Sequence, residues 1–100
     1  MKVNVHAVNF SVDQKLVNFI QERMDSLEKY YDKVVFADVY LKTENSSEKE
    51  NKCVDIKMNV PGDEFVVQKK CKTFEEAVVS AAEALERSLL KRKEKLRTHI

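Results

Sequence analysis

The sequence from Val54 to Val67 reads VDIKMNVPGDEFVV, and this stretch decides the fold of the chain. Its apolar residues alternate with polar ones as far as Pro61-Gly62, and an apolar face resumes after that pair. A period of two is typical of a strand with one buried face, and Pro-Gly is a strong turn signal. The stretch therefore predicts a hairpin with strands over 54–60 and 65–71.

Two further strands and a helix are predicted before the hairpin. Apolar residues alternate over 1–7 and again over 35–41, which indicates two half-buried strands. Between them, apolar residues at steps of three and four predict an amphipathic helix, with a capping box from Ser11 to Gln14 at its start. The polar stretch 44–51 predicts a loop. The apolar stripe of the helix consists of Leu16, Ile20, Met24, Leu27 and Tyr31.

A long helix is predicted after the hairpin. Thr73 and Glu76 form a second capping box, and the helical pattern continues to Arg97. A helix of about 25 residues measures about 37 Å, whereas a strand of about six residues spans only ~20 Å. We therefore expect the helix to overhang its sheet. Arg92 falls in line with the apolar stripe, which a projecting helix end would tolerate. The residues of the stripe are Phe74, Ala77, Val78, Ala81, Leu85 and Leu89.

The predicted order of elements is β-α-β-β-β-α, which favours an α+β fold. A right-handed crossover makes the first two strands parallel, and hairpin connections add the others. Both helices then cover one face of a four-stranded sheet. This arrangement is similar to the three strands and helices of double-stranded-RNA-binding domains, although a fold does not assign a function. With 100 residues and 43% apolar content, we expect one domain over 1–100.

Positive charge is concentrated at the C-terminal end of the chain. Residues 87–97 hold six Lys or Arg and one Glu, a net charge of +5, whereas residues 1–86 hold 12 basic and 16 acidic residues, a net charge of −4. One or two cations would suffice to complement a helix dipole, so this run indicates a site for a polyanion. The candidate RNA-binding residues are Arg87, Lys91, Arg92, Lys93, Lys95 and Arg97.

Composition excludes several other classes of protein. No run approaches the ~18 apolar residues of a membrane span, and residues 1–6 alternate instead of forming a charged leader and an apolar block. We therefore expect neither export nor membrane insertion, and a cytoplasmic location. Two cysteines without a CxxC pair or a paired histidine spacing argue against structural zinc, and no Gly-rich phosphate loop is present. No metal or cofactor is expected.

Two alternative functions fit parts of the sequence. A thiol-based redox enzyme or switch would use Cys53 and Cys71, which fall on adjacent predicted strands. The inward residues of these strands have opposite parity, so antiparallel register places Cys53 on the outer face and Cys71 on the inner face. This disfavours a disulfide, and no histidine is placed to activate either thiol, so we expect no enzyme. A protein-interaction module would instead use Phe36, Tyr40 and Val66 on the outer sheet face.

Four stretches carry a resemblance to a known family. They are MKVNV at 1–5, LEKYYD at 27–32, VYLK at 39–42 and LERSLLKRKEKL at 85–96. In this order, and in register over nearly the whole chain, they resemble the bacterial ribosome hibernation promoting factor and ribosome-associated translation inhibitor family. An end at Ile100 resembles the short form of that family.

The resemblance implies a protein that binds the small ribosomal subunit and its rRNA near the decoding region. There it would block the messenger and transfer RNA sites and inhibit translation under starvation, with a ribosome modulation factor as a further partner and a monomeric state off the ribosome. It leaves open whether such a protein promotes or opposes ribosome pairing. Arg92 is a less typical basic residue at its place, and Ser26 stands where a lysine is frequent. The RNA-contacting basic positions of the family match Arg23, Arg87, Lys91, Lys93 and Lys95.

Overall fold

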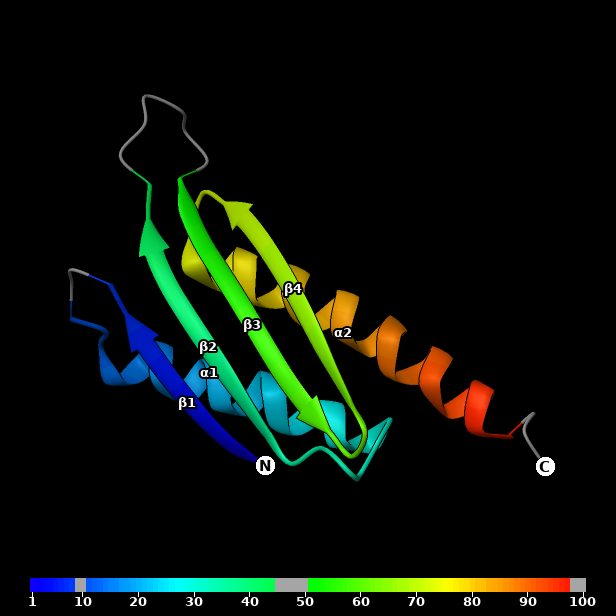
Figure 1. The fold of residues 1–100 in the computed structure, drawn as a ribbon. Helices are drawn as coiled ribbons and strands as arrows, with labels where there is room; N and C mark the ends of the chain where they lie inside the picture. Colours follow the sequence, from blue (N-terminus) through cyan, green and yellow to red (C-terminus); the bar gives the residue numbers. More distant parts are fainter. Residues whose placement is uncertain (9–10, 45–50, 98–100) are drawn as a thin grey trace.

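The computed structural model describes residues 1–8, 11–44 and 51–97, with side chains as far as Glu94. The helices and strands follow one another in the predicted order (Figure 1). A 3-10 turn, η1 (Leu27–Lys29), continues the first helix. Most of the predicted polar loop lies outside the described residues, but a backbone hydrogen bond of 2.9 Å from Glu44 to Asn51 closes its base. The elements are β1 (Lys2–Ala7), α1 (Gln14–Ser26), β2 (Phe36–Thr43), β3 (Lys52–Val60), β4 (Asp63–Cys71) and α2 (Phe74–Arg97).

The four strands form one mixed sheet in the order β1-β2-β3-β4. β1 pairs parallel with β2, and the other two pairs are antiparallel, as the crossover and hairpin arguments predict. Figure 1 shows α1 and α2 on the same side of this sheet, which confirms the α+β architecture. Gly62 turns the chain between β3 and β4 with a φ of 79°, a left-handed conformation that glycine adopts without steric cost.

The core lies between the inner face of the sheet and the apolar stripes of the two helices. Ile56 of β3 pairs in register with Val39 of β2 and Val67 of β4, so that the inward side chains of neighbouring strands form rows. Ile20 of α1 and Leu89 of α2 are both fully buried against this face. Burial of each such side chain favours the folded state by about 1.5–3 kcal/mol. The predicted stripes are therefore the packed faces of both helices.

The structure corrects the predicted cap of α1 and confirms the predicted cap of α2. α1 begins at Gln14, and its cap is Asp13, whose carboxylate accepts a hydrogen bond of 2.8 Å from the backbone N–H of Leu16. The prediction of Ser11 as the cap was wrong, because both residue types can cap a helix and Asp13 lies closer to the first apolar residue of the stripe. At α2, the hydroxyl of Thr73 accepts from the N–H of Glu76 at 3.1 Å, as predicted.

α2 is longer than the sheet that it crosses. Its 24 residues measure about 36 Å, whereas the nine residues of β4 span about 30 Å. β2, β3 and β4 have eight or nine residues instead of about six, so the overhang of α2 is shorter than expected. Figure 1 shows the C-terminal part of α2 running past the turn between β3 and β4. Within the described part of the chain, no helix combines the length and apolar character of a membrane span.

Candidate nucleic-acid interface

The basic end of α2, residues 87–97, holds six of the 18 Lys and Arg residues of the protein and a net charge of +5. Arg87, Lys91 and Lys93 are all exposed. At about 100° per residue, Arg87 and Lys91 lie about 40° apart around the helix axis, while Lys93 lies about 160° from Lys91. The cations therefore surround the helix instead of forming one stripe. Among the side chains that the structure describes, none forms an ion pair with these three residues.

Arg92 differs from its neighbours, because its guanidinium is bound to the rest of the protein. Its Nη1 lies 2.9 Å from a carboxylate oxygen of Asp63, and its Nη2 donates to the carbonyl of Pro61 at 2.8 Å. Its Nε donates to the hydroxyl of Tyr31 at 3.4 Å, and the guanidinium carbon lies 5.9 Å from the centre of that ring. The expectation that α2 already projects freely at Arg92 was wrong, because these contacts hold the helix against the domain at that residue.

Arg23 of α1 lies next to the side of α2 that faces α1. Arg23 lines a groove of about 160 Å³ between the two helices, and its Nε is buried without a hydrogen-bond partner in the described structure. Glu86 of α2 also lines this groove and accepts a hydrogen bond from Tyr30, which raises the pKa of the tyrosine hydroxyl. Lys93 lies two turns beyond Glu86 on the same side of α2, about 10 Å along the axis. Arg23 and Lys93 are therefore on a common flank.

Lys91 lies on the other flank of α2, next to the sheet edge. Together with Ser88 and Arg92 it lines a groove of about 400 Å³ against Asp63 and Phe65 of β4. The structure thus does not gather all of the predicted residues on one surface. It places Arg23 and Lys93 on one side of α2 and Lys91 on the other. The backbone of α2 extends to Arg97, but the side chains of Lys95 and Arg97 lie outside the described set.

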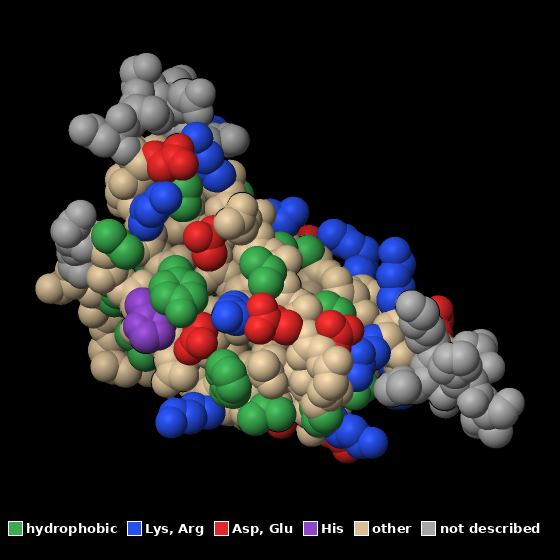
Figure 2. Space-filling model, in the orientation of Figure 1, with side chains coloured by type: hydrophobic (Ala, Val, Ile, Leu, Met, Phe, Trp, Pro, Cys, Tyr) green, Lys and Arg blue, Asp and Glu red, His purple; other side chains and the backbone are tan. Residues whose placement is uncertain are grey.

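The outer face of the sheet has a different electrostatic character. Figure 2 shows basic and acidic side chains interspersed over this face. The rings of His6 and Tyr40, outward residues of β1 and β2, stack with their centres 4.8 Å apart. Lys57 pairs with Glu64 at 3.6 Å, as outward neighbours on β3 and β4. A polyanion would meet balanced charge here, so the basic end of α2 is the better candidate surface. The outward charged residues of the strands are Lys2, Asp38, Lys42, Asp55, Lys57, Glu64 and Lys70.

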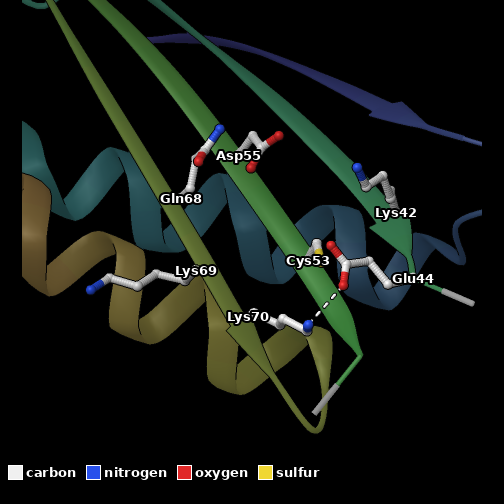
Figure 3. A pocket seen from close by; sticks show the side chains of 7 residues that line it. All are labelled: Lys42, Glu44, Cys53, Asp55, Gln68, Lys69 and Lys70. Atoms are coloured by element: carbon white, nitrogen blue, oxygen red, sulfur yellow. Dashed lines mark ion pairs between the residues drawn. The ribbon is translucent and has the colours of Figure 1, made fainter. Parts of the chain in front are cut away.

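A polar pocket on the outer face contains Cys53 (Figure 3). Burial and the nearby Glu44 carboxylate raise the pKa of the Cys53 thiol, while Glu44 itself pairs with Lys70 at 2.7 Å, which lowers the pKa of that carboxylate. Sequence reasoning missed the pair, since Glu44 was assigned to the loop and Lys70 to a solvated face. Cys53 is opposite Lys70 and Cys71 is opposite Lys52, so the two free thiols lie on different faces, as predicted.

The surroundings of Cys53 in this pocket do not favour a reactive thiolate, which a thiol enzyme needs. A raised pKa keeps Cys53 in its protonated, unreactive form at neutral pH. The Glu44 carboxylate and the Lys70 ammonium, which also line the pocket, form an ion pair with each other. In the part of the chain that the structure describes, no three His, Cys, Asp or Glu side chains are grouped to hold a metal ion. The outer pocket is therefore a weaker candidate than the basic end of α2.

Comparison with known proteins agrees with the fold and with the resemblance. Ribosome hibernation promoting factors from Pseudomonas putida and Azotobacter vinelandii are 30% and 26% identical over 95 residues, which cover 95% of this chain and 89% and 85% of those proteins. A ribosomal subunit interface protein from Coxiella burnetii has the same fold, with a TM-score of 0.84 at 16% identity over 94% of this chain and 99% of that one. The N-terminal domain of Thermus thermophilus Protein Y has a TM-score of 0.80 at 17% identity, over 91% and 98%.

The family model described as sigma 54 modulation protein / S30EA ribosomal protein matches residues 3–97. This range begins at the second residue of β1 and ends at the last residue of α2, so it covers the fold except for Lys2 at the start of β1. The chain belongs to the sigma 54 modulation protein / S30EA ribosomal protein family, and the resemblance to hibernation promoting factors that its sequence indicates is confirmed.

Proposed function

We propose that this protein is a ribosome hibernation factor that binds the small ribosomal subunit through its rRNA. It acts near the decoding region, blocks the messenger and transfer RNA sites, and so inhibits translation under stress or starvation. The names of the relatives from Pseudomonas putida and Azotobacter vinelandii support hibernation, and the name of the Coxiella burnetii protein supports a location at a subunit interface. The protein acts in the cytoplasm as one domain, without catalysis or a cofactor.

The observation that carries the proposal is the basic end of α2 at the edge of a rigid core. Arg87, Lys91 and Lys93 are exposed there and lack ion-pair partners among the described side chains. Lysine and arginine side chains in this state bind backbone phosphates and release counterions, which gives strong affinity for structured RNA. Lys95 and Arg97 extend the same run by one more turn, and Arg23 adds a cation from α1.

Inhibition in this mechanism is steric. The helix end binds rRNA phosphates, and the sheet and helices behind it fill space that messenger or transfer RNA would otherwise occupy. The core supplies the stiffness, because Leu85 and Leu89 fix α2 to the sheet directly beside the basic residues. No bond is made or broken, so the protein leaves the ribosome intact when it dissociates. We expect a monomer off the ribosome, with a ribosome modulation factor as a further partner on it.

Sedimentation of cell extracts from growing and starved cells tests this function. The protein is expected to move from the top of the gradient into ribosomal fractions on starvation. A protein that stays in the top fractions in both states would contradict ribosome binding. With purified small subunits, the bound protein is also expected to displace messenger RNA and initiator transfer RNA. Simultaneous binding of all three would contradict a position near the decoding region.

A further inference from the structure

Arg92 connects three parts of the protein that are distant in sequence. Its guanidinium binds the carbonyl of Pro61 in the turn between β3 and β4 and the carboxylate of Asp63 at the start of β4, and it contacts Tyr31, two residues after η1. Tyr31 is itself buried, with 8% of its surface exposed. A planar fork of donors suits this arrangement, because each nitrogen can address a different acceptor.

These contacts lie at the point where α2 leaves the domain. Among the described side chains of α2, which reach Glu94, the last fully buried one is Leu89, one turn before Arg92, and Leu90 is already 39% exposed. The hydrogen bonds and the ion pair of Arg92 join the helix beyond Leu89 to Pro61 and Asp63. Arg92 therefore fixes the direction of the helix end, and with it the positions of the neighbouring Lys91 and Lys93.

We propose that Arg92 is a positioning residue for RNA binding and not itself a phosphate ligand. Only 21% of its side chain is exposed, and the carboxylate of Asp63 at 2.9 Å neutralises its charge. A phosphate that approached it would also meet this carboxylate. The exposed Lys91 and Lys93 make the phosphate contacts, and Arg92 fixes their position relative to the rest of the domain. This inference rests on the proposed function and assigns Arg92 a role that differs from the one its sequence context predicts.

Two variants separate positioning from direct binding. Arg92→Lys keeps the positive charge but cannot reach Tyr31, Pro61 and Asp63 at the same time. If Arg92 is a positioning residue, this variant binds small subunits roughly two- to tenfold more weakly, because the helix end must be ordered on binding. Asp63→Ala removes a negative charge near the RNA. Electrostatics alone would strengthen the binding of this variant to small subunits. Loss of positioning would instead weaken that binding roughly two- to tenfold, as for Arg92→Lys.

The salt dependence of binding gives a further readout. Arg92→Gln is expected to weaken binding without changing the slope of log K against log salt, whereas Lys93→Gln flattens the slope by roughly one unit. Arg92→Gln in the Asp63→Ala background should have a smaller effect than in the wild type, since the contact with Asp63 is already lost and only those with Pro61 and Tyr31 remain to be removed. Arg92→Lys with wild-type affinity, tighter binding by Asp63→Ala, or a flatter slope for Arg92→Gln would each overturn the proposal.

Amide hydrogen exchange of the free protein keeps this test independent of the proposed function. In Arg92→Gln, the amides from Lys91 to Glu94 are expected to exchange faster, while those of β3 remain protected. Unchanged exchange at the helix end would overturn the positioning role. If the wild-type protein fails to bind small subunits, the proposed function is wrong, and the exchange result alone then decides whether Arg92 orders the helix end. Urea unfolding of each variant confirms that the binding assays compare folded proteins.

Discussion

Leu89 and Leu90 are neighbours in the chain but lie in opposite environments on α2. Leu89 is fully buried against the sheet, whereas 39% of Leu90 is exposed. This contrast places the packed face of the helix directly beside the basic residues that follow. The residues that stabilise the domain and the residues of its proposed binding surface therefore lie within one helical turn of each other.

The two leucines provide a matched test of this packing. Leu89→Ala is expected to lower the free energy of unfolding by about 2–5 kcal/mol, because it removes a buried side chain and leaves a cavity. Leu90→Ala changes the same residue type on the exposed side and is expected to alter it by at most about 0.5 kcal/mol. Urea denaturation measures both. Similar losses for the two variants would show that the helix is rotated relative to this structure.

Reversal of charge at the basic end should abolish binding without unfolding the domain. The triple variant Lys91→Glu, Lys93→Glu and Lys95→Glu is expected to lose detectable binding to small subunits, because three phosphate contacts become repulsive. Its melting temperature should stay close to that of the wild type, since Lys91 and Lys93 are exposed. Filter binding and thermal melting measure these two quantities.

A control triple variant carries the same change of charge on other exposed residues. Lys2→Glu, Lys42→Glu and Lys72→Glu lie on the outer sheet face or before the start of α2. This variant is expected to keep at least a large part of the binding affinity. Equal loss of binding in both variants would indicate a response to net charge and not a defined interface.

The reassigned cap of α1 makes a prediction about stability. Asp13→Ala is expected to lower the free energy of unfolding by about 0.5–2 kcal/mol, because the N–H of Leu16 loses its acceptor. Ser11→Ala, at the cap position favoured by the sequence pattern, should have an effect near zero. Chemical denaturation of the two variants distinguishes the caps. A larger loss for Ser11→Ala would restore the position predicted from the sequence.

The thiols should be dispensable for activity. A Cys53→Ser, Cys71→Ala double variant is expected to inhibit translation as the wild type does, because the two residues lie on opposite faces and the pKa of Cys53 is raised. A raised pKa also means that little thiolate is present at neutral pH, so Cys53 should react slowly with iodoacetamide until the pH rises. Translation assays and alkylation rates measure the two effects. Loss of inhibition in a folded double variant would favour a thiol-based mechanism.

Sequence patterns predict the fold well because the spacing of apolar residues in each strand and helix marks the face that is buried. The alternation over 54–60 and the stripe through Ile20 and Met24 each mark a buried face, and all of these apolar positions are buried. The cap of α1 was predicted wrongly, because Ser11 and Asp13 have the same capping chemistry two residues apart. The order of the strands followed from connection rules instead of from any single residue.

The candidate site was predicted only in part. A sequence shows where charged residues lie along the chain, but it does not show which of them form ion pairs or hydrogen bonds in the fold. The run from Arg87 to Arg97 identifies the basic end of α2 without any structure. The partners of Arg92 are 29 and 61 residues away at Asp63 and Tyr31, and no local pattern marks them. The pair between Glu44 and Lys70 was missed for the same reason.

The central claim is that the basic end of α2 binds rRNA phosphates, and the salt dependence of small-subunit binding tests it most directly. Contacts from Arg87, Lys91, Lys93, Lys95 and Arg97 would give log K against log salt a slope of about −3.5 to −4.5. Lys93→Gln is expected to flatten this slope by roughly one unit, whereas Lys42→Gln, on the outer face of the sheet, should leave it unchanged. If Lys42→Gln flattens the slope as much as Lys93→Gln does, the sheet faces the RNA and the account is contradicted.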